Sequence, residues 1–176
     1  VADAPSLSVS DASGSEDGAI ALTISAALTD PSETLAITIA GVPTGAALSA
    51  GTNLGGGTWS LTAAQLAGLT ITPPANSDAD FTLTVTATST DGSASASTSA
   101  ALAVSVAAAA DQPNLSVSAA SGSEDTAIPL SIAASLADTD GSETLSISIS
   151  GVPTGAALSA GTDQGGGVWS LTAAQL

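Results

Sequence analysis

The 176-residue chain contains no lysine, arginine, histidine or cysteine, although 16 of its residues are Asp or Glu. Nucleic-acid binding depends on Lys and Arg to displace counterions from phosphates, so this class of partner is excluded. Without His, Cys and Lys the chain cannot form a Ser-His-Asp triad, a thiol nucleophile, a His/Cys zinc site or a Schiff base. The composition therefore predicts a protein that is not an enzyme.

Aromatic side chains and long apolar runs are also scarce. Trp59, Phe81 and Trp169 are the only aromatic residues. The longest mainly apolar stretch, residues 100–110, is about half of the roughly 20 residues that a membrane helix needs, so membrane insertion is not expected. The first residues lack the basic region of a signal peptide, which is typical of a mature or internal segment.

Two parts of the chain are near copies of one another. Segment 13–17, Ser-Gly-Ser-Glu-Asp, returns 108 residues later, and segments 41–52 and 59–66 return 110 residues later. A period of this length exceeds that of a solenoid unit and fits a small domain used in tandem. We therefore expect one domain at residues 1–107 and a second at 108–176 that matches only the first two-thirds of the copy.

Short runs in which apolar residues alternate with Ser, Thr or Ala dominate both copies. This is the pattern of half-buried strands, and Gly, Pro, Asn and Asp between the runs indicate turns. The expected strands of the first copy are 6–10, 19–25, 34–40, 46–50 with 57–61, 68–72, 80–88 and 95–106; those of the second lie around 115–117, 128–132 and 145–149. The fold class is all-β, with tandem antiparallel Ig-like sandwiches of about 108–110 residues as the expected architecture.

Most of the acidic residues fall in the loops between these strands. In the strand order of an Ig-like sandwich, the loops at 16–17 and 76–80 lie at the C-terminal pole of the first domain. Residue 111 and the loop 138–143 lie at the N-terminal pole of the second domain. Eight carboxylates are thus expected near one junction: Glu16, Asp17, Asp78, Asp80, Asp111, Asp138, Asp140 and Glu143. No basic side chain can neutralise them, and Ca²⁺, which takes six to eight oxygen ligands, suits such a cluster better than Mg²⁺. Solvated turns are the plainer alternative.

A few other residues have plain structural interpretations. Trp59 and Trp169 are expected to anchor the cores, and the three glycines at 55–57 to form a hairpin turn. Asp11 and Asp163 are expected to be surface charges without partners.

The order of the motifs resembles that of a known group of proteins. Ser-Glu-Asp, Asp-x-Asp-Gly-Ser-Glu, Gly-x-Pro-x-Gly-Ala and Trp-x-Leu-Thr follow one another as in the cadherin-like and bacterial Ig-like repeats of giant secreted adhesins of the RTX or biofilm-associated type. The first copy departs from the pattern because Asp30-Pro31-Ser32-Glu33 lacks the second Asp. The resemblance implies calcium between neighbouring repeats, type I secretion and an extracellular place at the cell surface or in the biofilm matrix.

The expected function is therefore structural. It is that of a non-catalytic repeat of an adhesin stalk or matrix fibre, rigidified by interdomain calcium, whose partners are neighbouring repeats and other copies in a fibre. O-glycans on the abundant Ser and Thr are a further possibility. Two alternatives stay open: a calcium-dependent module that binds a ligand or glycan, and a filament subunit assembled by donor-strand exchange.

Overall fold

The computed structural model describes residues 1–176 and is built almost entirely of β-strands. It divides into two compact units, unit 1 (Val1–Ala109) and unit 2 (Ala110–Leu176), and the division falls two residues after the boundary expected from the repeat. No helix of the structure has the length and apolar character that crossing a bilayer requires. Each unit is described by itself.

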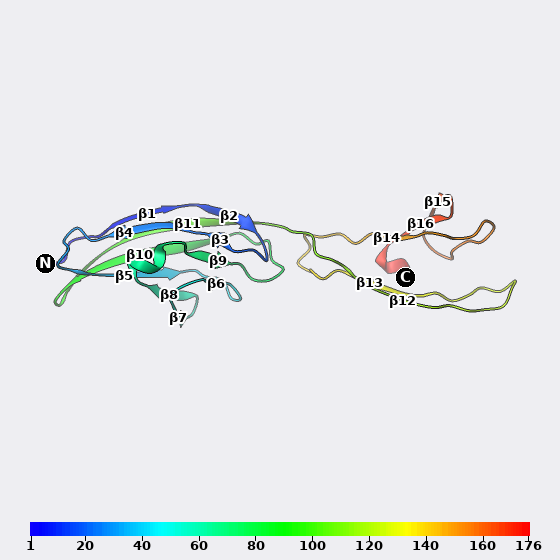
Figure 1. Cartoon of the computed structure of the whole chain (residues 1–176), viewed down its shortest axis with the longest axis horizontal. Helices are drawn as coiled ribbons and strands as arrows, with labels where there is room; N and C mark the ends of the chain where they lie inside the picture. The colour runs from blue at the N-terminus through cyan, green and yellow to red at the C-terminus, as the bar shows by residue number, and fades with distance from the viewer. The chain divides into compact units, whose positions relative to one another are not determined.

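Unit 1 contains eleven strands and one turn of 3₁₀-helix (Figure 1). They are β1 (Ser6–Ser10), β2 (Ala12–Ser15), β3 (Ile20–Ala21), β4 (Thr23–Ala27), β5 (Thr34–Ala40), β6 (Ala47–Leu48), β7 (Thr52–Gly55), β8 (Thr58–Leu61), η1 (Ala63–Leu66), β9 (Thr70–Thr72), β10 (Phe81–Asp91) and β11 (Ala94–Ala107). Every expected range of unit 1 contains a strand, although the range 19–25 is divided into β3 and β4. The strands β2 and β7 were not expected, and the glycine turn at 55–57 joins β7 to β8 as a hairpin.

The strands of unit 1 form two layers. One is a six-stranded sheet in the order β2-β11-β10-β5-β8-β7. The other combines the pair β1-β4 with the sheet β3-β9-β6, because β3 and β4 are separated only by Leu22, whose N–H donates to the carbonyl of Leu69. The first two strands of the chain lie in different layers. β1 pairs with β4 in one layer, and β2, which follows Asp11, runs parallel to β11 in the six-stranded sheet.

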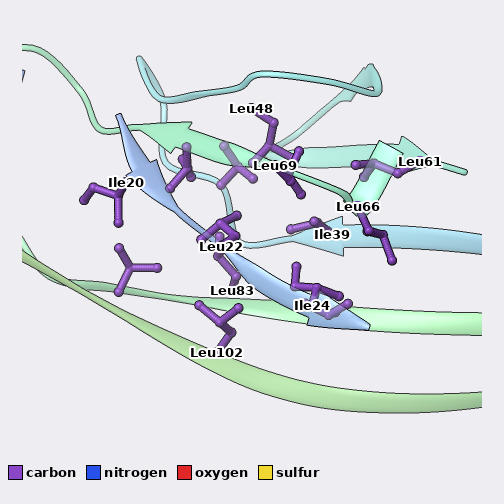
Figure 2. Close-up of a cluster of buried hydrophobic side chains, with 14 of the residues drawn as sticks. Ile20, Leu22, Ile24, Ile39, Leu48, Leu61, Leu66, Leu69, Leu83 and Leu102 are labelled. Atoms are coloured by element: carbon purple, nitrogen blue, oxygen red, sulfur yellow. The ribbon is translucent and has the colours of Figure 1, made fainter. Parts of the chain in front are cut away.

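The core lies between these layers and is entirely aliphatic at its centre. Period-two alternation turns Leu83 and Val85 of β10 inward, and both are fully buried. Figure 2 shows Ile20, Leu22 and Ile24 of one layer facing the other layer across this cluster. Trp59 packs against the core but stays half-buried, so it borders the core rather than anchoring its centre.

Unit 2 contains five strands and a 3₁₀ turn in two small sheets (Figure 1). They are β12 (Asn114–Ser118), β13 (Ser131–Ser135), β14 (Ile147–Ile149), β15 (Thr162–Gly165), β16 (Val168–Leu171) and η2 (Ala173–Gln175). β12 pairs with β13, and β14-β16-β15 form the second sheet. We expected residues 128–130 and 145–146 to lie in strands, but they form no strand in the structure. In unit 1 the matching segments pair with β9 and β10, which have no counterpart in unit 2.

The stability of unit 1 should depend on the buried β10 positions. We expect Leu83→Ala to lower its free energy of unfolding by about 2–5 kcal/mol, because the substitution opens a cavity in a fully buried site. Leu54→Ala is the control, since Leu54 is 61% exposed in the β7–β8 hairpin and should change stability by less than about 0.5 kcal/mol. Urea unfolding followed by circular dichroism measures both. Equal losses in the two variants would contradict the assignment of the core.

Candidate metal-binding sites at the ends of the units

Three carboxylates meet at the end of unit 1 that holds the β4–β5 turn. One oxygen each of Asp3, Asp30 and Glu33 lies within 4.8 Å of the others. Calcium binds oxygen at about 2.4 Å, so two ligands on opposite sides of one ion are about 4.8 Å apart. A single cation can therefore contact all three side chains.

Glu33 is the buried member of this group, with 6% of its surface exposed. Its Oε1 accepts a hydrogen bond from the backbone N–H of Asp3 at 2.8 Å, while its Oε2 is buried and has no hydrogen-bond partner. A buried polar atom without a partner is costly and calls for a physical explanation. A cation between the three carboxylates would supply the missing interaction.

The backbone around the site holds these acids in place. Asp30 lies in the turn before β5, where its Oδ1 accepts a hydrogen bond from the backbone N–H of Ser32 at 2.9 Å. This bond, joined by one from the Ser32 side chain, lowers the pKa of Asp30 below its ordinary value, so the group remains charged at weakly acidic pH.

Asp3 is fixed by contacts of its own segment with three other parts of unit 1: β10, the β4–β5 turn and β11. Its carbonyl oxygen accepts from the hydroxyl of the buried Ser89. The neighbouring carbonyls of Ala4 and Pro5 accept from Thr29 at 2.9 Å and Thr98 at 2.8 Å. The ligands of the site thus come from two segments that are far apart in sequence, the N-terminal segment and the β4–β5 turn, and β10 and β11 hold the first of them in place.

The opposite end of unit 1 collects several of the acids predicted as ligands. Asp17, at φ 57°, accepts at Oδ1 from the backbone N–H of Asn76 at 3.0 Å, which brings the β2–β3 turn and the β9–β10 loop side by side. Asp80, at the end of that loop, accepts from the N–H of Val106 at 2.7 Å. Glu16 accepts at Oε1 from the N–H of Ala109 at 2.7 Å. Asp78 is exposed in the same loop.

The first residues of unit 2 and its β13–β14 loop hold the other predicted ligands. Glu143 accepts at Oε1 from the backbone N–H of Asp111, and its Oε2 is buried without a hydrogen-bond partner. Asp138 accepts from the N–H of Asp140 at 2.8 Å and from the hydroxyl of Ser142 at 3.2 Å. The bond from Asp111 to Glu143 repeats the one from Asp3 to Glu33, so the two units build this end in the same way.

The loop contacts also revise the comparison of the two copies. Asp140 accepts from the N–H of Ser142 at 2.8 Å, just as Asp30 accepts from the N–H of Ser32. By its contacts Asp30 thus corresponds to Asp140, the second Asp of the loop. The residue that the first copy lacks is therefore a counterpart of Asp138, the first Asp.

Sequence reasoning missed Asp3 and Glu33 as ligands, although a signal existed. Asp3 stands two residues before Pro5 as Asp111 stands two before Pro113, and Glu33 ends its loop as Glu143 does. The meeting of the ligands predicted in unit 1 with those predicted in unit 2 stays a prediction.

Asp11 is exposed at the surface as expected, but the expectation that it has no partner was wrong. Its Oδ1 accepts a hydrogen bond from the backbone N–H of Ala103 at 2.9 Å, where the chain passes from β1 to β2. Asp163 bonds only within its own hairpin, to the N–H of Gly165 at 2.8 Å.

Comparison with known proteins finds no match: no family model, no curated protein and no solved structure is similar to this chain. The chemistry of the acidic ends therefore rests on their own geometry.

Glu33→Gln should have effects of opposite sign with and without calcium. In EDTA the variant should be more stable than the parent by about 1 kcal/mol or more, because it removes one of three mutually repelling charges. In millimolar Ca²⁺ it should be the less stable protein, because a ligand is lost. Thermal unfolding in both buffers measures the difference, with Asp163→Asn as the matched control. A change of the same sign in both buffers would argue against a cation site.

Proposed function

We propose that this protein is a non-catalytic structural repeat of a long extracellular adhesin stalk or matrix fibre, stabilised by Ca²⁺ bound at the ends of its β-sandwich units. One observation carries the proposal: the cluster of Asp3, Asp30 and Glu33, with the buried, unpartnered Oε2 of Glu33. The cluster lies in a chain without a single basic side chain, and the N-terminal ammonium pairs with Asp91 at 2.7 Å, so a cation from solution is the partner left for the cluster.

The arrangement of unit 1 supports an Ig-like or cadherin-like sandwich. Two layers enclose one aliphatic core, and the first part of the chain is divided between them as β1 and β2. Near-identical segments recur in unit 2, including the hairpin β15–β16 and the turn η2. Tandem modules of this kind serve as spacers, because each folds on its own core and joins the next through a short linker.

The linker between the units supports a role for calcium in stiffening the array. On the unit 1 side the N–H of Ala109 is held by Glu16, and on the unit 2 side the N–H of Asp111 is held by Glu143. Ions that bind these carboxylates would restrain the linker backbone through the same side chains. The partners of each repeat are then its neighbours in the chain and other copies in a fibre.

The ligand chemistry favours an extracellular setting. The Asp3–Asp30–Glu33 site has three carboxylates, of which only that of Glu33 is buried, and it lacks the twelve-residue loop of a high-affinity EF-hand. Sites of extracellular modules bind calcium with dissociation constants of about 10⁻⁴–10⁻³ M, which suits a medium that contains millimolar Ca²⁺.

Calcium should raise the stability of the protein, and chelation should remove the gain. Binding to the native state alone adds about 2.7 kcal/mol at a hundredfold excess of free ion over the dissociation constant. Calorimetry in Ca²⁺, in Mg²⁺ and in EDTA measures the effect, with the smallest gain over EDTA expected from Mg²⁺. An unchanged melting temperature on adding EDTA to calcium-loaded protein would contradict the proposal.

Loss of the loop carboxylates of unit 2 should loosen the linker. We expect Asp138→Ala combined with Asp140→Ala to lower the maximum dimension measured by small-angle scattering in millimolar Ca²⁺, because a bent linker brings the units closer on average. Asp163→Ala, which removes only a bond within its own hairpin, is the control. Equal dimensions for the two variants would count against calcium as the stiffening agent.

A further inference from the structure

One strand of unit 1 is paired on both sides over only part of its length. β11 pairs with β10 on one side, and the register of the two strands runs without a shift. On the other side, β2 pairs only with Val104–Ala107, and the N–H of Ala103 donates to Asp11. Residues 94–102 therefore form an unpaired edge of the six-stranded sheet, the β11 edge.

The alternation of the backbone decides which groups lie on this edge. Ala103 donates its N–H toward the β2 side of the strand, whereas Val106 donates its N–H to Asp80, on the β10 side. Because successive residues of a strand face opposite neighbours, the odd-numbered residues of β11 face the β2 side throughout. The β11 edge therefore presents the N–H and C=O groups of Ser95, Ser97, Ser99 and Ala101.

The β11 edge lacks the features that usually protect a free edge. Natural β-sheets use charged side chains, prolines, bulges or very short edge strands for this purpose. The opposite edge of the same sheet is protected, because β7 has only four residues and its pairing with β8 shifts between Asn53 and Gly55. Residues 94–102 include no charged residue and no proline, and their pairing with β10 shows no bulge. Such an edge is a template for another strand.

The side chains next to the edge leave its backbone accessible. On the outward face they are exposed, small and uncharged, as at Ser97 and Ala101. Ser99 already forms a hydroxyl pair across the ladder with β10, where its Oγ lies 2.8 Å from Oγ1 of Thr86. Serine side chains can form the same pairs across a new ladder.

The acids close to this edge stand at its ends rather than along it. Asp11 lies at one end, where it accepts from Ala103, and Asp91 lies at the other, opposite Ala94 in the register with β10. A chain with 16 acidic and no basic side chains repels a second copy of itself. Pairing along the β11 edge brings two copies together without placing an acid in either of the paired strands.

The edge is also complementary to itself. A two-fold axis at Thr98, the middle of the stretch, places Ser97 of one copy opposite Ser99 of the other. Each residue that faces the edge then meets one that also faces it, as the hydrogen-bonded pairs of an antiparallel ladder require. The second copy's β2 lies beyond the paired stretch, because its Ala103 falls opposite Ser93, in the β10–β11 turn.

We propose that the β11 edge binds the β11 edge of a second copy of the protein in antiparallel orientation, so that two six-stranded sheets join into one. The contact is isologous, because both copies contribute the same strand. It uses unit 1 alone and requires neither the calcium sites nor the proposed function.

The association should be weak and should strengthen with salt. A single short ladder buries less surface than the roughly 1,200 Å² of a stable interface, so the pair belongs with transient complexes. Salt screens the repulsion between the acidic copies, because the Debye length falls from about 30 Å at 0.01 M to about 3 Å at 1 M. A contact between opposite charges would weaken under the same conditions.

Sedimentation of the 176-residue protein from about 10 µM to about 1 mM tests the association, because weak complexes dissociate in this range. We expect a monomer–dimer equilibrium whose association constant rises by about tenfold or more between about 0.01 M and about 0.5 M NaCl, in EDTA as well as in Ca²⁺. Protein that stays monomeric at every concentration would overturn the proposal. A dimer that forms only in Ca²⁺ would overturn it too, since bridging ions would then hold the copies together.

Amide hydrogen exchange identifies the strand that makes the contact. In dilute protein the N–H groups of Ser97 and Ser99 face solvent and should exchange fast, whereas those of Thr98 and Ala100 face β10 and should be slow. In concentrated protein the exchange of Ser97 and Ser99 should slow by about threefold or more, with Thr98 and Ala100 unchanged. A dimer that leaves Ser97 and Ser99 as fast as before would place the contact elsewhere and refute the proposal.

Two substitutions at one position separate edge pairing from general stickiness. Ser97→Pro removes a donor from the edge but none from the ladder with β10, so it should lower the association constant by about tenfold or more in a folded protein. If the proline unfolds unit 1, Ser97→Lys gives the answer, with Thr84→Lys as the matched control. Thr84 is exposed on the same face of the sheet, but in the interior strand β10. Equal dimer formation by the two lysine variants would rule out the β11 edge as the contact.

Discussion

The absence of any basic side chain governs how this chain can use its acidic residues. The N-terminal ammonium pairs with Asp91 at 2.7 Å, and the charge of the other acids can be offset only by hydrogen-bond donors such as backbone N–H and hydroxyl groups or by cations from solution. The structure uses the first of these repeatedly: Asp11 accepts from Ala103, Asp17 from Asn76, Asp80 from Val106 and Glu33 from Asp3. Each bond joins segments that are distant in sequence, so the acids fasten loops and strand ends to the sheets. Where three carboxylates converge, at Asp3, Asp30 and Glu33, these donors no longer suffice.

The second constraint is that a strand exists only where it has a neighbour. The Ser-Gly-Ser motif forms a strand at 13–15, where β11 lies alongside, but not at 121–123, where no such neighbour is present. The Ala-Leu pair at 47–48 behaves in the same way, since it pairs with β9 in unit 1 and its twin at 157–158 is unpaired. The hairpin β15–β16 survives because both of its strands lie within the repeated segment.

These two constraints explain how much of the structure could be predicted from the sequence. Period-two alternation located the strands of unit 1, and its range 34–40 agrees with β5 at both ends. Alternation is a local signal, however, and cannot report whether a pairing partner is present, so residues 128–130 were wrongly assigned to a strand. For the acidic ends, the order of the loops correctly placed Asp17 near residue 76. The role of Asp3 was missed because it depends on hydrogen bonds that Ser89, Thr29 and Glu33 make with the backbone of residues 3 and 4.

Charge and strand pairing are separated in space within unit 1. The sheet faces carry Ser, Thr and Ala outside and aliphatic residues inside, while the acids stand in the loops and at the points where strands begin and end. Repulsion between the acids therefore acts on loops and leaves the ladder hydrogen bonds intact. Cation binding should accordingly tighten the ends of a unit whose core is already formed. Unit 2 differs from unit 1 in this respect. Hydrogen bonds hold its acidic loop together, whereas several of its apolar side chains are exposed.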